Sequence, residues 1–152
     1  MGFTIETYRE LARHPMIVGT KEASSDYKLI AQIRAYCGDD FAVWSGNDNE
    51  TLPIMALGGV GVISVFANIC PVNMQNICQL WLNGGIGESR RCFLKAIPLM
   101  DALFCEVNPA PVKTAMNLLG MDAGMLRMPL CEMLPKNLEL LKAAMREYGL
   151  AL

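Results

Sequence analysis

Three short apolar runs separated by helical patterns constrain the fold of this chain more than any other feature. The runs are residues 16–20, 41–45 and 60–66, and each is rich in β-branched or aromatic residues. Their hydrophobicity is continuous rather than alternating, which is typical of parallel strands that are covered on both faces. Helical patterns precede or separate them in residues 4–15, 26–37 and 48–58. The sequence therefore predicts βα units built on a parallel sheet.

Only helical patterns follow the third run. Apolar residues recur at helical spacing in residues 71–84, 93–100, 111–120 and 135–149. The length of 152 residues fits a single domain. An eight-stranded barrel of βα units needs about 250 residues, so three strands would form only part of one.

Composition and charge exclude several classes of protein. Thirteen Lys and Arg against fifteen Asp and Glu leave no basic surface for nucleic acid. No apolar run reaches the roughly 18 residues of a membrane span, and the first residues lack the pattern of a signal peptide. We therefore expect a cytoplasmic protein with no membrane partner. The six cysteines are expected to be small buried hydrophobes, and the single histidine, His14, provides no zinc site.

Lys21 is the first candidate for chemistry, because it follows the first apolar run directly. At the carboxyl end of a parallel strand, burial lowers the pKa of a lysine and frees its amine to attack a carbonyl carbon. Gly19 shares its face of the strand and leaves room beside the amine. The alternative is a lysine that reaches water or pairs with a carboxylate. Glu22 points to the other face, where we expect a solvated or helix-facing charge.

The glycine-rich segments have structural explanations. Gly46 follows the second run, where it permits a ligand to approach the backbone closely, and Asp48 is explained as a helix N-cap. The glycines of residues 58–61 precede a strand instead of opening a helix, so the dinucleotide-binding fingerprint is absent.

Seven segments together resemble the dihydrodipicolinate synthase and N-acetylneuraminate lyase family. They are residues 19–24, 29–34, 38–41, 45–48, 58–65, 108–113 and 126–130. The resemblance spans essentially the whole chain and is nearest to the synthases. It implies a partial (β/α)8 TIM barrel, an α/β fold. Strands six to eight with their helices would occupy residues 1–85, and a C-terminal helical extension residues 86–152.

The resemblance also implies a reaction. The family forms an imine between a barrel lysine and pyruvate, a role that falls on Lys21 without any other cofactor. The imine gives an enamine that attacks an aldehyde, which in the synthases of lysine biosynthesis is aspartate semialdehyde. Ile63 matches the position whose backbone lies against pyruvate, and Gly46 lies in the loop facing the same pocket. Two alternatives stay open: a lyase acting on a sialic or sugar acid, and a non-catalytic assembly module.

The chain departs from the family pattern at its start. The family's catalytic tyrosine, substrate-binding arginine and paired threonines lie upstream of the segments that match. Four tyrosines are present, but none matches the tyrosine motif: Tyr8, Tyr27, Tyr36 and Tyr148. We therefore expect a truncated or split enzyme that is weak or inactive alone, because such groups supply orders of magnitude in rate. Unpaired strand edges predict association with itself or with an N-terminal half-barrel.

Overall fold

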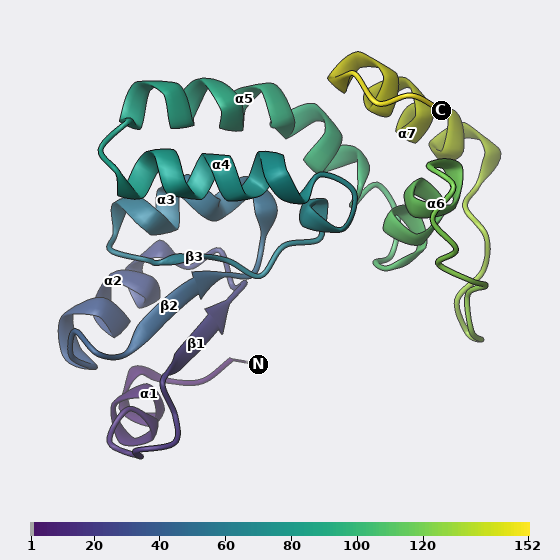
Figure 1. The fold of residues 1–152 in the computed structure, drawn as a ribbon. Coiled ribbons are helices and arrows are strands. Elements are labelled where there is room, and N and C mark those ends of the chain that lie inside the picture. Colours follow the sequence, from purple (N-terminus) through teal and green to yellow (C-terminus); the bar gives the residue numbers. More distant parts are fainter. Residues whose placement is uncertain (1) are drawn as a thin grey trace. The chain divides into compact units, whose positions relative to one another are not determined.

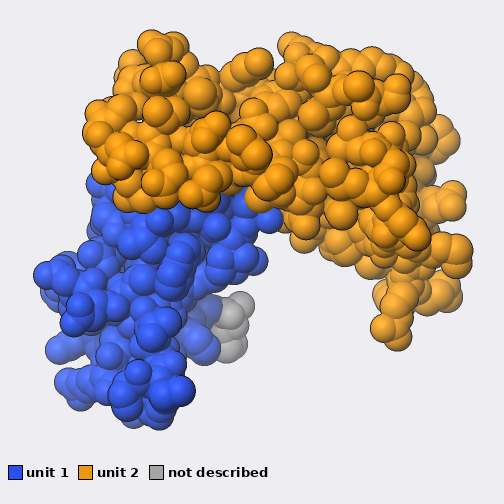
Figure 2. Space-filling model, in the orientation of Figure 1, with its two compact units in different colours: residues 1–64 blue, residues 65–152 orange. Residues whose placement is uncertain are grey.

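The computed structural model describes residues 2–152. The chain divides into two compact units, residues 1–64 and 65–152 (Figure 2). Every strand found in residues 2–152 belongs to the first unit, and the second unit is helical. This division falls earlier than the boundary at residue 85 that we drew from the sequence. The separation of a barrel part from a helical extension stays a prediction.

A parallel sheet forms the first unit (Figure 1). Among residues 2–64 its strands are β1 (Gly19–Glu22), β2 (Ala42–Ser45) and β3 (Gly61–Val62), paired in that order. The register sets Lys21 opposite Trp44. The predicted parallel arrangement is confirmed, since both pairings are parallel.

The strands do not coincide with the apolar runs. Met16 begins the first run, yet it is 82% exposed and lies before β1. In the third run only two residues are paired, and its last residue, Phe66, opens the 3-10 turn η2 (Phe66–Asn68). Both predictions of strand bounds were wrong, because a strand requires a hydrogen-bonding neighbour, which apolar character alone does not specify.

Within residues 2–64, three helices and one 3-10 turn accompany the sheet. Their bounds are α1 (Ile5–Leu11), α2 (Tyr27–Tyr36), the 3-10 turn η1 (Asp48–Glu50) and α3 (Thr51–Ala56). Thr4 and Asp26 cap α1 and α2, since each side-chain oxygen accepts a backbone N–H of the first turn. The helices and the sheet bury a common apolar cluster of Tyr8, Ile30, Ile33, Phe41, Val43 and Ile54.

Within residues 2–64 the helices cover one face of the sheet. Val43 on that face is fully buried, whereas Trp44 on the other face is half-buried and Lys21 is exposed. The latter face, which carries Gly19, Lys21, Ala42, Trp44 and Gly61, is called the open face below. The sequence predicted cover on both faces of the strands, and an inner face that loses its cover if the strands are only part of a barrel. Within residues 2–64 the helices pack on the Val43 side alone, as a partial barrel implies.

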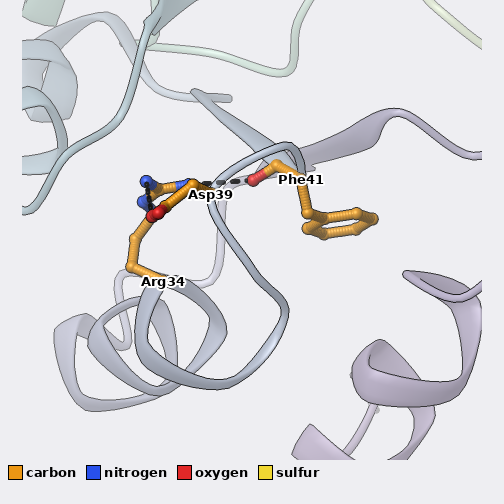
Figure 3. Close-up of polar contacts among 3 residues, drawn as sticks. All are labelled: Arg34, Asp39 and Phe41. Carbon is orange, nitrogen blue, oxygen red and sulfur yellow. Dashed lines mark hydrogen bonds and ion pairs between the residues drawn. The ribbon is translucent and has the colours of Figure 1, made fainter.

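Arg34 fastens the loop that leads from α2 into β2 (Figure 3). Its Nη1 donates a hydrogen bond to the carbonyl oxygen of Phe41 at 2.9 Å, and its Nη2 lies 3.9 Å from Oδ1 of Asp39. The Asp39 side chain is fully exposed, so this ion pair contributes little to stability. The bond to Phe41 instead holds the start of β2 against α2.

The second unit contains the longest helices in residues 2–152. Within residues 65–152 they are α4 (Pro71–Leu82), α5 (Ile86–Ala102), α6 (Ala110–Leu118) and α7 (Pro135–Tyr148). As predicted, Pro135 begins the last helix, while Pro111 takes the second position of α6 instead of the first. Helix α5 packs against both α4 and α7. None of the helices in residues 2–152 is long and apolar enough to cross a bilayer.

The cysteines are less uniformly buried than their composition suggested. Cys70 and Cys78 are buried, whereas Cys131 is exposed. The remaining three are half-buried: Cys37, Cys92 and Cys105. The prediction of six buried cysteines is therefore wrong for Cys131, which lies in the irregular segment between α6 and α7.

Candidate functional site

The carboxyl ends of the three strands meet at one edge of the sheet. Lys21 lies one residue before the end of β1, Gly46 directly follows β2, and Ile63 directly follows β3. The N–H of Gly46 donates to the carbonyl oxygen of Glu22 at 2.7 Å. The N–H of Ile63 donates to the carbonyl oxygen of Ser45 at 2.9 Å. The fold thus brings the three residues singled out in the sequence to one edge.

Gly46 packs against the stem of Lys21. A Cβ atom at position 46 would lie 3.1 Å from Cε of Lys21 and 2.6 Å from Cβ of Ala23. A larger residue would have to displace one of these neighbours. The glycine therefore sets the path along which the Lys21 side chain leaves the sheet.

The amine of Lys21 is not withdrawn from water within the first unit. Its side chain is exposed, and Ile63 is 50% exposed. The space expected beside Gly19 is also occupied. The carbonyl oxygen of Ala42 lies nearest to the point where a Cβ at position 19 would be, and Cζ3 of Trp44 lies 2.6 Å from that point. The expectation of a desolvated amine beside a vacant glycine is therefore wrong here. A dry site requires a cover over the open face.

Glu22 holds the turn after Lys21 from the opposite face of the sheet. It is only 6% exposed. Its Oε1 accepts the N–H groups of Ala23 at 3.0 Å and Ser24 at 3.1 Å. Its Oε2 accepts the hydroxyl of Tyr8 in α1 at 2.7 Å. Glu22 is thus helix-facing, as the sequence suggested, but it is buried and bound at both oxygens instead of solvated.

The contact between Tyr8 and Glu22 had no signal in the sequence. The two residues are 14 positions apart, in a helix and a strand that share no local pattern. Periodicity placed Tyr8 on the inner face of its helix, where it is 7% exposed. Only the packing of α1 on the sheet brings the Tyr8 hydroxyl to Glu22.

The Tyr8 hydroxyl makes stability depend on pH. Burial, and then the hydrogen bond to Glu22, raise the pKa of Tyr8 from 10.0 to about 12. A raised pKa in the folded chain stabilises it below pH 10, and this contribution is lost as the pH rises through about 12. We expect Tyr8→Phe to remove up to about 2 kcal/mol of this alkaline fall in the free energy of unfolding. Urea unfolding at several pH values checks this, and an equal fall in both proteins would contradict it.

Asn47 joins the loops that follow β1 and β2. Its Nδ2 donates to the carbonyl oxygen of Ala23 at 3.4 Å and to Oε2 of Glu50 at 3.0 Å. The buried Ser45 hydroxyl donates to the carbonyl oxygen of Asn47 at 2.6 Å. Asn47 also holds the N-cap position of η1, so the assignment of that position to Asp48 was wrong. The two loops form one connected edge beside Lys21.

Parallel βα units build α/β barrels, whose functional residues lie at the carboxyl edge of the strands, and solved structures support this class. The chain is similar to dihydrodipicolinate synthase from Cyanidioschyzon merolae with lysine bound, at a TM-score of 0.96 and 37% identity over 99% of this chain and 51% of that one. It is also similar to dihydrodipicolinate synthase from Thermotoga maritima, at a TM-score of 0.91 and 40% identity over 97% of this chain and 51% of that one. The fold is consistent with part of an α/β barrel.

Sequence relatives define the family. The 4-hydroxy-tetrahydrodipicolinate synthase of Thermoanaerobacter sp. (strain X514) is 51% identical over 146 residues, which are 95% of this chain and 49% of that protein. The synthase of Clostridium novyi (strain NT) is 44% identical over 149 residues, which are 98% of this chain and 50% of that protein. The chain spans about half the length of these relatives. A model of the dihydrodipicolinate synthetase family matches residues 1–148, and the chain belongs to this family of lyases.

Proposed function

We propose that this chain supplies the imine-forming lysine of a 4-hydroxy-tetrahydrodipicolinate synthase. The observation that carries the proposal is the position of Lys21 at the carboxyl edge of a parallel sheet, with its stem against Gly46. A curated relative that is 51% identical bears this name. The strands would be the sixth to eighth of a barrel, and the helices after residue 85 its extension.

Lys21 would act as the nucleophile. Its unprotonated Nζ adds to the keto carbon of pyruvate, and the keto oxygen leaves as water to give an imine. The protonated imine withdraws electrons from the neighbouring methyl group, so loss of a methyl proton gives an enamine. The enamine carbon bonds to the aldehyde carbon of aspartate semialdehyde, whose oxygen takes up a proton. The imine itself is the electron sink, and the proposal needs no other cofactor.

Gly46 and Ile63 would form the wall against the bound keto acid. The N–H of Ile63 already donates to the carbonyl oxygen of Ser45, which leaves the carbonyl group and side chain of Ile63 available for contact with pyruvate. Gly46 keeps the space above the Lys21 stem free of a side chain. A sugar-acid lyase of the same family would share this imine step and differ in its aldehyde.

A second chain or chain segment would complete the site. In residues 2–64 the outer edge of β1 has no neighbouring strand, and Val18 just before it is 67% exposed. Such an edge pairs readily with another strand. We propose that the cover is the other half of a barrel, or another copy of this chain. It would also supply the groups that move protons, so this chain alone would turn over slowly.

Trapping with borohydride tests the proposal. The chain is incubated with pyruvate, reduced with sodium borohydride, digested and analysed by mass spectrometry. We expect the mass of one reduced pyruvate on Lys21. Adding the half of the Thermoanaerobacter synthase that this chain does not cover should increase both the adduct and the turnover of aspartate semialdehyde.

Two variants control this experiment. Lys21→Arg keeps the charge and should abolish the adduct, whereas Lys28→Arg alters another exposed lysine and should leave it unchanged. Failure to trap any adduct on Lys21, with or without the added half, would favour the non-catalytic assembly module. Equal labelling of the Lys21→Arg variant would mean that pyruvate reacts with surface lysines at random.

A further inference from the structure

Trp44 lies at the centre of the open face, beside Lys21. The register sets it opposite Lys21 on one side and opposite Gly61 on the other. Paired residues of a parallel sheet point to the same face, and neighbouring strands are about 4.8 Å apart. Trp44 is therefore an immediate neighbour of the residue proposed to form the imine.

The indole of Trp44 lies across all three strands. Its Cζ3 is 2.6 Å from the point where a Cβ at position 19 would lie, and its Cδ1 is 3.8 Å from the corresponding point at position 61. Gly19 is two residues before Lys21, on the same face of β1. The ring thus fills the space on the amino-terminal side of Lys21. The absence of a side chain at Gly19 admits it, whereas a Cβ at position 61 would lie in ordinary van der Waals contact with the ring.

Two surfaces restrict the stem of Lys21. Gly46 approaches its Cε at the carboxyl edge, and the indole occupies the space over Gly19. The indole therefore occupies the path by which the stem could fold back along β1. Apart from the solvent above the open face, the remaining direction leads Nζ toward the edge where β2 and β3 end, and Cε already lies beside Gly46 at that edge.

We propose that Trp44 is a positioning residue for Lys21, and that its indole is an apolar floor that directs Nζ toward the carboxyl edge and excludes water from beneath the imine. This inference rests on the proposed function. A smaller apolar side chain would leave space over Gly19 into which the lysine stem can fold. The reactive orientation would then be less populated, and imine formation would need more pyruvate.

The size of the effect follows from how much of the floor is removed. Trp44→Leu should raise the pyruvate concentration for half-maximal trapping at Lys21 about tenfold, equivalent to about 1.4 kcal/mol. Trp44→Phe retains a ring at this position and should have a smaller effect. Far-UV circular dichroism establishes whether each variant is folded. If Trp44→Leu does not fold, the titration of Trp44→Phe tests the positioning role of Trp44.

Tryptophan fluorescence tests the floor directly. The chain has two tryptophans, so in the 152-residue chain carrying Trp81→Phe all tryptophan emission comes from Trp44. Pyruvate is titrated into this protein, and the adduct on Lys21 is measured by borohydride trapping in the same samples. We expect the emission of Trp44 to change in proportion to the adduct. The same protein carrying Lys21→Arg should show no change.

The outcomes distinguish a failure of the positioning role of Trp44 from a failure of the proposed function. In one outcome an adduct forms on Lys21 while the emission of Trp44 stays unchanged, and Trp44→Leu and Trp44→Phe need no more pyruvate for half-maximal trapping. This result overturns the positioning role of Trp44 and leaves the proposed function standing. Failure of any adduct to form on Lys21 overturns the proposed function, and the floor with it. A matched change in emission and adduct, with weaker pyruvate binding in the variants, supports both.

Discussion

Glu22→Ala is expected to lower the free energy of unfolding by about 4 kcal/mol, a large part of the stability of a typical domain. Three hydrogen bonds to a buried carboxylate are lost, from the hydroxyl of Tyr8 and the N–H groups of Ala23 and Ser24. The Tyr8 hydroxyl is also left in a site from which water is excluded. Urea unfolding at pH 7 measures the change.

Two further variants show whether the hydrogen bonds are the cause. Glu22→Gln keeps an oxygen for the N–H groups of the turn and should cost only about 1 kcal/mol. Tyr8→Phe combined with Glu22→Ala should cost less than the sum of the single changes, because the stranded hydroxyl is gone. A loss below about 1 kcal/mol for Glu22→Ala would contradict the account of this turn.

Gly46→Ala is expected to slow imine formation at Lys21 about 100-fold, since displacements near 1 Å in a reacting group have effects of this size. The new Cβ would meet Cε of Lys21 at 3.1 Å and Cβ of Ala23 at 2.6 Å. Ala23 belongs to the turn held by Glu22, so the lysine stem and the start of this turn must both move. The rate of borohydride trapping with pyruvate measures the effect.

Gly87→Ala is the matched control. A Cβ at position 87 meets no atom within 4 Å, and the residue lies in the first turn of α5, where alanine is favourable. Its trapping rate should equal that of the unchanged chain. If Gly46→Ala also traps pyruvate at the original rate, the path of the Lys21 stem is not set by Gly46.

The candidate site was partly readable from the sequence. An apolar run followed by Lys21 indicated a lysine at the end of a parallel strand, and the strand pairing bears this out. Gly46 and Ile63 follow the next two strands, so the same rule brought them to the same edge. The imine chemistry of these residues stays a prediction. What the run could not reveal is the environment of the lysine, because this depends on the neighbouring strands.

Local patterns in the sequence were sufficient for the order of helices and strands and for several helix ends. Capping residues such as Thr4 and Asp26 act within one turn, and apolar periodicity acts within one element. The parallel sheet follows because strands joined by helices pair most readily in that way. Capping and periodicity depend on residues close together in the chain, and the parallel direction of the strands follows from the order of the elements, so the sequence alone determined these properties.

Only the tertiary structure decided which residues surround Lys21. The bond from Tyr8 to Glu22, the indole of Trp44 over Gly19, and the exposure of the lysine all depend on contacts between separate elements. A strand end is likewise set by where its neighbour stops donating hydrogen bonds. Burial and pairing are properties of packed surfaces, and no local pattern specifies which surfaces meet.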